Sequence, residues 1–365
     1  MGSCSWLLVP CYYPPSADMA GEQVAARASV VARPAGTAGA AVTPTPAAAG
    51  ERPGALPKRV IAGFTIAVPV LLGAYAGGAW FLLGTTVVTF LALREFYRLS
   101  SRPGARLVQP LGFLLAFELL LANGGRDLVG SSMAGLAGLP GGGVVEALLR
   151  PDRFAVFTRF AVAAAVILPL IALLFERKDP RGRLVGWALT LAGTLYVAWL
   201  ISHFQTLRLV GEAGSEAGRG WVFYTLAGTW CFDTGAYLVG RPFGRHRFMT
   251  WISPNKTWEG AAGGLVLCLL VTLVARSPLP FPPLAQLVGW APLPIPLWHA
   301  PFLALAVSAA AQLGDLAESM IKREAGAKDA SELIPGHGGM LDRLDSLLFT
   351  VVLVYYYAVV IALPL

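Results

Sequence analysis

The stretch SLLFTVVLVYYYAVVIAL, residues 346–363, contains no charged side chain in eighteen consecutive positions. A helix of about 20 mostly apolar residues is long enough to cross the hydrocarbon core of a bilayer. The stretch therefore predicts a transmembrane helix near the carboxyl end of the chain.

Eight further apolar runs precede this stretch. Windows of about 20 residues place them at roughly 60–77, 79–93, 108–122, 154–175, 185–203, 221–239, 260–275 and 301–314. The 365 residues are 56% hydrophobic and 13% charged, with a mean hydropathy of +0.62, whereas about a quarter of a soluble domain is charged. The composition excludes a soluble enzyme and predicts an all-α polytopic membrane protein with about nine transmembrane helices.

The distribution of positive charge predicts the orientation of these helices. With the N-terminus inside, the inside connections carry eighteen Lys and Arg residues and the outside connections carry six. Because cytoplasmic loops are enriched in Lys and Arg, we expect the N-terminus inside and the C-terminus outside. The net charge of +7 then reflects topology and contact with anionic lipid, and nucleic acid is not an expected partner.

The first 57 residues differ in composition from the rest. They are rich in Ala, Pro, Gly and Thr, as in TAGAAVTPTPAAAG at 37–50, which predicts a disordered tail before an integral membrane domain at 58–365. The tail contains three acidic residues beside three arginines, unlike an acidic-poor organelle transit peptide, so we expect the plasma membrane of a bacterium. The four cysteines have no metal-binding spacing, and neither a disulfide framework nor zinc is expected.

The connection at about 315–345 is far more polar than the spans beside it. If the preceding span continues as a helix, Asp315, Ser319 and Lys322 share one face, and Asp342 and Asp345 share a face at the start of the last span. Carboxylates without His or Cys partners suit a hard cation such as Mg²⁺, and lysines beside them suit phosphate. The glycines around His337, including Gly338 and Gly339, allow backbone N–H groups to approach an anion. The alternative is an ordinary cytoplasmic loop with salt-bridged charges.

A second polar connection, at about 240–259, faces the same side in this topology. Asp233 lies in the apolar span before it, where an ionisable residue marks a cavity, a partner or a structural hydrogen bond. Ser253, Asn255 and Lys256 precede the next span, where a helix N-terminus favours anions. Both connections are therefore expected on the cytoplasmic side, and each carries residues that suit phosphate.

These residues resemble the signature of the phosphatidate cytidylyltransferases, the CDP-diacylglycerol synthases. The match runs through Ser319, Lys322, Arg323, Lys328, Asp329, Ser331, Ile334, Pro335, His337, Gly338, Gly339, Asp342, Arg343 and Asp345 without a departure. The segments DTGAYLVGR and SPNKTWEG are also similar to family segments, so the resemblance covers most of 60–365. It implies transfer of the cytidylyl group of CTP to phosphatidic acid, giving CDP-diacylglycerol and pyrophosphate.

The resemblance also implies roles for the residues. Asp315 and Asp342 are the first-choice ligands of Mg²⁺, and Asp345 and Asp233 are the second choices. Phosphate neutralisation, catalysis and substrate binding are expected from Lys322, Arg323, Ser319, Lys256, Asp345, Ser253, Asn255, His337, Gly338, Gly339, Arg343 and Lys328. Potassium as a second cation and a homodimer are implied by the resemblance alone.

Two alternatives remain open at the level of sequence. A related CTP-using lipid enzyme, such as a CDP-archaeol synthase or a polyprenol kinase, is the closer one, although the full signature favours phosphatidate. An ion-coupled transporter would also carry carboxylates in its spans, but it would show internal repeats with charges at the membrane midplane. No such repeat is found.

Overall fold

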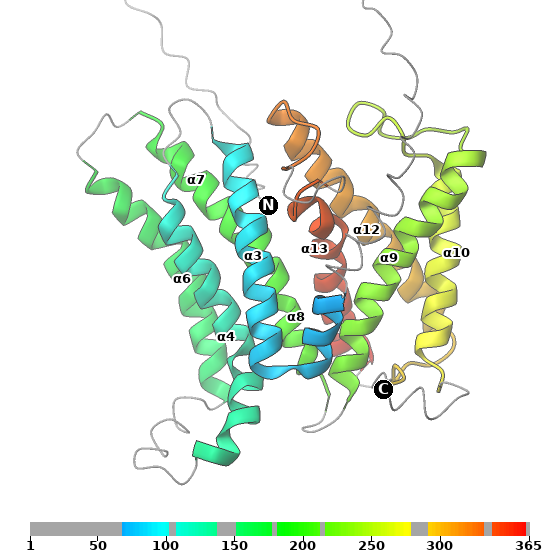
Figure 1. The fold of residues 1–365 in the computed structure, drawn as a ribbon, viewed down its shortest axis with the longest axis horizontal. Coiled ribbons are helices and arrows are strands. Elements are labelled where there is room, and N and C mark those ends of the chain that lie inside the picture. The colour runs from blue at the N-terminus through cyan, green and yellow to red at the C-terminus, as the bar shows by residue number, and fades with distance from the viewer. Residues whose placement is uncertain are drawn as a thin grey trace, which may run out of the picture. The chain divides into compact units, whose positions relative to one another are not determined.

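The computed structural model describes residues 68–101, 107–136, 151–176, 181–211, 216–278, 291–331 and 338–362. Within these ranges the chain is helical, with a short helix at 68–76 followed by the elements of Figure 1. They are α3 (Gly78–Ser100), α4 (Gln109–Leu136), α6 (Pro151–Leu174), α7 (Arg183–Gly193), the π-helical segment η2 (Thr194–Trp199), α8 (Leu200–Arg208), α9 (Ala217–Phe243), α10 (Trp258–Ala275), α12 (His299–Glu324), α13 (Leu341–Tyr356) and the π-helical segment η3 (Tyr357–Ala362). The predicted disordered tail at 1–57 lies outside the described residues.

Eight of the nine apolar runs coincide with helices of the described chain, and in the first run, at 60–77, the described part contains the helix at 68–76. Within the described residues, six helices or unbroken runs of helical segments are long and apolar enough to cross a membrane. They are Gly78–Ser100, Val156–Leu174, Arg183–Arg208, Trp258–Ala275, His299–Glu324 and Leu341–Ala362. For the described residues, the length and composition of these helices confirm the prediction of an all-helical, multi-pass membrane protein.

Several helices extend past the predicted spans, among them α3, α9 and α12. α3 continues to Ser100, α9 to Phe243 and α12 to Glu324, whereas the apolar runs end where charged residues begin. A helix needs only its backbone hydrogen bonds, and Glu, Lys and Arg are good helix formers, so a change in polarity does not end it. The polar ends of these three helices build the side of the protein that is described below.

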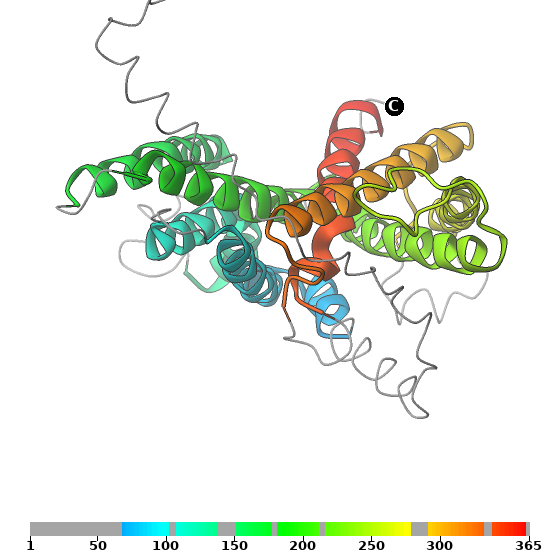
Figure 2. The same ribbon diagram turned by 90° about the horizontal axis from the view of Figure 1, so that it is seen from above.

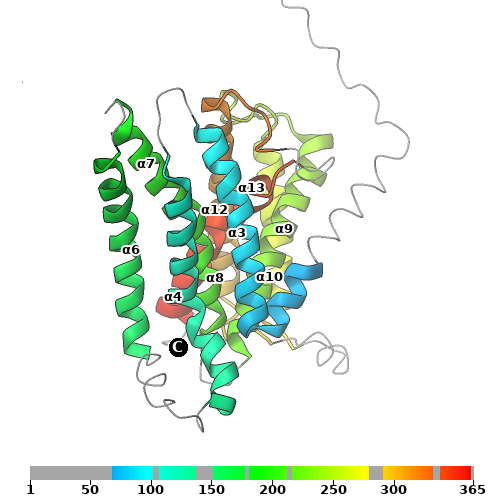
Figure 3. The same cartoon turned by 60° about the vertical axis from the view of Figure 1, so that its left-hand side comes forward.

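Contacts between connections show which helix ends lie together. Arg98 near the end of α3 donates to the Ala330 carbonyl at 2.8 Å, and Arg323 near the end of α12 donates to the Ile252 carbonyl at 3.4 Å. At the opposite ends, Arg208 of α8 donates to the Ala74 carbonyl at 3.4 Å. Figures 1 and 3 show the same alternation of helix direction, with the connection 244–257 and the residues 325–331 that follow α12 on one side.

Glycines bring the helices of the C-terminal half close together. A Cβ atom at Gly235 of α9 would meet the Gly263 carbonyl of α10, and one at Gly314 of α12 would collide with the Asp345 carbonyl of α13. Small residues at such crossings let helix backbones approach closely inside a membrane. Figure 2 shows α9 and α10 side by side, with α12 and α13 next to them.

Candidate active site

A polar cavity of about 660 Å³ lies among α9, α10, α12, α13 and the 244–257 connection. Four carboxylates line it, one from α9, one from α12 and two from the first turns of α13: Asp233, Asp315, Asp342 and Asp345. Ser253, Asn255 and Lys256 line it as well. Both polar constellations of the sequence therefore meet at one cavity.

The ion pair between Lys256 and Asp315 joins the two constellations directly. Its Nζ–Oδ2 distance is 2.8 Å, and the same Nζ donates to the Gln312 carbonyl at 3.3 Å. On α12, the Ser319 hydroxyl donates to Asp315 Oδ1 at 3.3 Å, one helical turn away. The predicted continuation of this span as a helix, with Asp315 and Ser319 on one face, is confirmed.

Lys322 lies one turn further along α12 and contacts two other carboxylates. It pairs with Glu318, whose side chain is fully buried, and its Nζ lies 2.7 Å from Asp342 Oδ1. Because an unpaired charge in a low-dielectric environment is costly, each member of this cluster depends on the others. Glu318 was not among the predicted site residues, although a Glu one turn before Lys322 is a recognisable helix pair.

Asp342 also organises the turn that leads into α13. Its Oδ2 accepts hydrogen bonds from Gly339 N at 2.7 Å and Ala330 N at 3.0 Å. Gly338 has a φ of +76°, a conformation that glycine adopts without steric cost. The Gly339 N–H, predicted as an anion donor, is thus directed at Asp342. His337 and the preceding turn residues lie outside the described residues.

Glu95 of α3 is a second residue that sequence reasoning missed. Its buried carboxylate accepts from Leu341 N at 2.7 Å and Met340 N at 3.1 Å, and the Ser331 hydroxyl donates to it. The first backbone N–H groups of a helix have no partner within the helix, and here Glu95 caps those of α13. The available signal in the sequence was an acidic residue two positions after the end of an apolar span.

The 244–257 connection is folded back onto the start of α10. Thr257 caps this helix by accepting from Gly260 N at 3.2 Å, and Glu259 accepts from Arg245 N and His246 N at 3.2 Å each. A backbone bridge pairs Arg247 with Thr257. These bonds hold Lys256, which directly precedes the cap, in position over the cavity.

Several predicted residues do not line this cavity, among them Arg323, Lys328 and Arg343. Arg323 is exposed and donates to the Ile252 and Ala327 carbonyls at 3.4 Å each, and Lys328 is exposed on the connection that follows α12. Arg343 borders a second, apolar cavity on the other face of α13. The structure thus places the predicted residues in one region, but only some of them at the polar cavity.

Mg²⁺ fits the chemistry of the polar cavity. Among the described side chains, no three His, Cys, Asp or Glu are grouped closely enough to hold a metal ion alone. Mg²⁺ is usually bound by one or two carboxylates together with water and substrate phosphates, so a complete protein cage is not required. Asp315, Asp345 and Asp233 supply hard oxygen atoms from three helices around one space.

These features define a multi-pass helical membrane protein with a cavity of carboxylates and lysine at one end of its helices. Residues 57–361 match the cytidylyltransferase family, and the chain belongs to that family.

Three relatives illustrate the similarity. The phosphatidate cytidylyltransferase of Bacillus subtilis is 32% identical over 281 residues, which cover 75% of this chain and 94% of that protein. The chloroplastic phosphatidate cytidylyltransferase 4 of Arabidopsis thaliana is 31% identical, covering 83% of this chain and 73% of that protein. The Synechocystis phosphatidate cytidylyltransferase is 30% identical, covering 83% and 95%.

Proposed function

We propose that this protein transfers the cytidylyl group of CTP to phosphatidic acid, giving CDP-diacylglycerol and pyrophosphate for phospholipid biosynthesis. The observation that carries the proposal is the convergence of Asp233, Asp315, Asp345 and Lys256 on one cavity in a chain that belongs to the cytidylyltransferase family. The names of the relatives favour phosphatidate over an archaeal lipid or a polyprenol.

In this reaction an oxygen of the lipid phosphate attacks the α-phosphorus of CTP. A new P–O bond forms, the bond between the α-phosphorus and the bridging oxygen breaks, and pyrophosphate leaves in line with its electron pair. The attacking phosphate is already an anion, so no strong general base is needed. Most of the rate must come from positioning and from neutralising phosphate charge.

The residues at the cavity suit that task. Lys256 lies at the cavity wall beside Asp315 and can neutralise a CTP phosphate there. Ser253 and Asn255 line the same cavity and can donate hydrogen bonds. Lys322 is held by Glu318 and Asp342 at the entry to α13, which keeps its ammonium group close to the reacting phosphates.

The carboxylates are proposed to hold Mg²⁺, which would offset the charge of the triphosphate and of the leaving pyrophosphate. Asp315, Asp345 and Asp233 have oxygens at the cavity. Asp342, predicted as a first-choice ligand, has both oxygens engaged by Lys322 and two backbone N–H groups, so we propose that it orients these groups beside the metal. Potassium and a homodimer stay predictions, to be checked by cation titration and by mass measurement in nanodiscs.

The proposed setting is a bacterial plasma membrane with nine crossings, the N-terminus inside and the polar cavity open to the cytoplasm, where CTP is found. The support is the excess of positive charge on the connections of that side. A chloroplastic relative makes a plastid membrane the alternative.

The direct test is incubation of the purified protein with labelled CTP, phosphatidic acid and Mg²⁺. We expect labelled CDP-diacylglycerol, with one pyrophosphate released for each, and no product when phosphatidic acid or Mg²⁺ is omitted. Folded protein that makes no CDP-lipid from phosphatidic acid but uses another lipid phosphate would reassign the substrate. Protein that instead moves ions across liposomes would falsify the proposal.

A further inference from the structure

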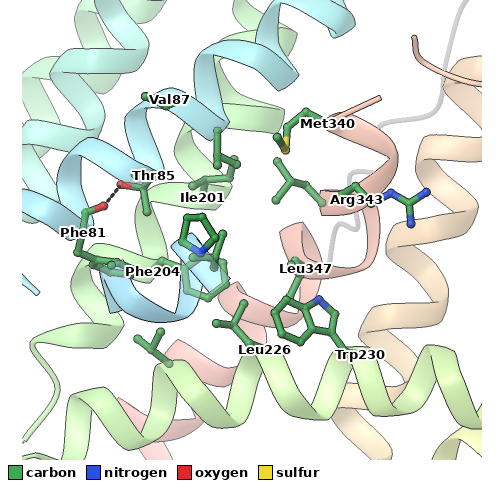
Figure 4. A pocket seen from close by; sticks show the side chains of 17 residues that line it. Phe81, Thr85, Val87, Ile201, Phe204, Leu226, Trp230, Met340, Arg343 and Leu347 are labelled. Atoms are coloured by element: carbon green, nitrogen blue, oxygen red, sulfur yellow. Dashed lines mark hydrogen bonds between the residues drawn. The ribbon is translucent and has the colours of Figure 1, made fainter. Parts of the chain in front are cut away.

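An apolar cavity of about 590 Å³ lies on the other face of α13, among helix 68–76, α3, α8, α9 and α13 (Figure 4). Phe81, Phe204, Leu226 and Leu347 are typical of its lining. The hydroxyl of Thr85, which also borders it, donates to carbonyls of its own helix and accepts from Gln205. The cavity is therefore suited to hydrocarbon, and its volume falls within the usual range for a ligand site.

Two helices form the partition between this cavity and the polar one. On α13, Leu344 and Leu347 line the apolar cavity, whereas Asp342 and Asp345 line the polar cavity. On α9, Trp230 lines the apolar cavity and Asp233 lines the polar one. The two cavities are consequently separated by little more than one helix thickness at the first turns of α13.

Arg343 lies on α13, in the partition between the two cavities, next to Asp342 and Leu344 in the sequence. Its side chain borders the apolar cavity, and Figure 4 shows its guanidinium pointing away from the apolar side chains. A guanidinium binds phosphate through two parallel hydrogen bonds. An Arg at the edge of an apolar cavity therefore suits a lipid that carries a phosphate monoester at one end and acyl chains at the other.

We propose that the apolar cavity receives an acyl chain of phosphatidic acid and that Arg343 holds the lipid phosphate at its edge, facing the polar cavity. This inference rests on the proposed function and adds the place of the lipid substrate. Moving a chain from the bilayer into an apolar cavity gains little, because lipid tails are as apolar as leucine. The phosphate contact therefore anchors the lipid, and the shape of the cavity determines whether the chain fits.

Gly84 of α3 offers a way to fill the cavity. It borders the cavity, and a Cβ atom placed on it would meet no other atom of the described residues within 4 Å. Gly84→Leu should occupy the space without moving the backbone. The matched control is Leu83→Phe, because Leu83 neighbours Gly84 on the same helix, is 55% exposed and does not line the cavity.

We expect Gly84→Leu to raise the KM for dioleoyl phosphatidic acid by at least about tenfold and to leave the KM for CTP unchanged. A change of this size is typical when a hydrophobic pocket no longer fits its substrate. Dihexanoyl phosphatidic acid, whose chains need little of the cavity, should be used within about threefold of the wild-type rate, and Leu83→Phe should behave as wild type. Unchanged kinetics with both lipids, or equal losses with both, would overturn the proposal.

A measurement on the unmodified protein covers the case in which Gly84→Leu does not fold. A phosphatidic acid with a photoreactive diazirine in one acyl chain should label peptides that contain Phe204 and Leu226, and unlabelled phosphatidic acid, but not phosphatidylcholine, should displace it. Labelling confined to the exposed face of α6, or labelling that phosphatidylcholine also displaces, would show ordinary surrounding lipid and refute the site. If the wild-type protein makes CDP-diacylglycerol in the same preparation, the function stands whichever result the labelling gives.

Discussion

Single charges at the polar cavity are held by partners from distant parts of the chain. Lys256 and Asp315 belong to different connections and form an ion pair at 2.8 Å. Lys322 lies between Glu318 and Asp342. In a site of low dielectric such pairs keep the groups charged and in fixed orientations, so that they are ready to meet phosphate and metal.

Removal of one carboxylate at the cavity should reduce catalysis strongly. Asp315→Asn and Asp345→Asn each delete a proposed metal-binding oxygen and its charge, and we expect kcat to fall by at least about a hundredfold, as for the loss of one preorganised electrostatic group. Raised Mg²⁺ should restore part of the activity. Initial rates across a Mg²⁺ titration provide the measurement.

The matched control for these carboxylates is Glu324→Gln. Glu324 is exposed at the end of α12 and does not line the cavity, so this variant should keep its activity within about threefold, because solvated charges are screened. Equally small losses in Asp315→Asn, Asp345→Asn and Glu324→Gln would mean that the metal site is misplaced.

Substitutions in the Glu318–Lys322 pair can show whether Lys322 acts in catalysis or only neutralises Glu318. Lys322→Met leaves the fully buried Glu318 without its cation and should lower stability by about 3–5 kcal/mol and abolish activity. Adding Glu318→Gln should restore most of the stability, because the unpaired charge is gone, but should not restore activity. Thermal unfolding and turnover, measured on both variants, test this; recovery of activity together with stability would show that Lys322 only neutralises Glu318.

At the scale of elements, α3 fixes the position at which α13 begins. Glu95 accepts from the first N–H groups of α13, and Arg98, one turn later, donates to the Ala330 carbonyl. Ala330 N in turn donates to Asp342. Ala330 is thus held by Arg98 and Asp342, and the start of α13 is held by Glu95, which sets the position of both α13 carboxylates.

Glu95 is therefore expected to act as a positioning residue. Glu95→Ala removes the cap of α13 and should lower kcat by about tenfold or more, with little change in the KM for CTP, since displacement of catalytic groups costs rate. Glu95→Gln keeps one oxygen that can accept a hydrogen bond and should retain an intermediate kcat.

Arg94→Gln is the control for Glu95, because Arg94 is exposed on the neighbouring position of α3. Kinetics of the three variants at varied Mg²⁺ would check this role. Equal activity in Glu95→Ala and Arg94→Gln would argue against a positioning role for Glu95. The same conclusion would follow if Glu95→Ala lowered the amount of protein in the membrane but left the kcat of the remaining protein unchanged.

At the scale of the whole molecule, the alternation of helix direction places the functional connections on one side. In a cysteine-free background, Asp329→Cys reports on the 325–340 connection and Glu216→Cys on the start of α9; both side chains are exposed. The positive-inside orientation predicts that a membrane-impermeant thiol reagent added to intact cells modifies Cys at 216 and leaves 329 unmodified until the cells are opened. Modification at 329 alone would invert the topology.

The sequence by itself determined the class of protein, the helices and the region of the site. In a bilayer, a long apolar run must satisfy its backbone hydrogen bonds within itself, as a helix does, and each run contains a helix in its described residues. The 3.6-residue period of a helix predicts that Asp315 and Ser319 lie on the same helix face, and the structure shows a hydrogen bond from the Ser319 hydroxyl to Asp315. Local periodicity and composition are properties of short segments, which is why they can be read from the sequence.

The tertiary structure decided which charges meet. How α3, α9, α12 and α13 pack decides that Lys256 pairs with Asp315, that Glu95 caps α13 and that Arg343 borders the apolar cavity. This packing is set by close glycine contacts between helices, and van der Waals fit of this kind leaves no periodic signal in a sequence. The helical period places Asp342 and Arg343 in neighbouring positions, but only the packed neighbours of α13 direct one toward the polar cavity and the other to the border of the apolar one.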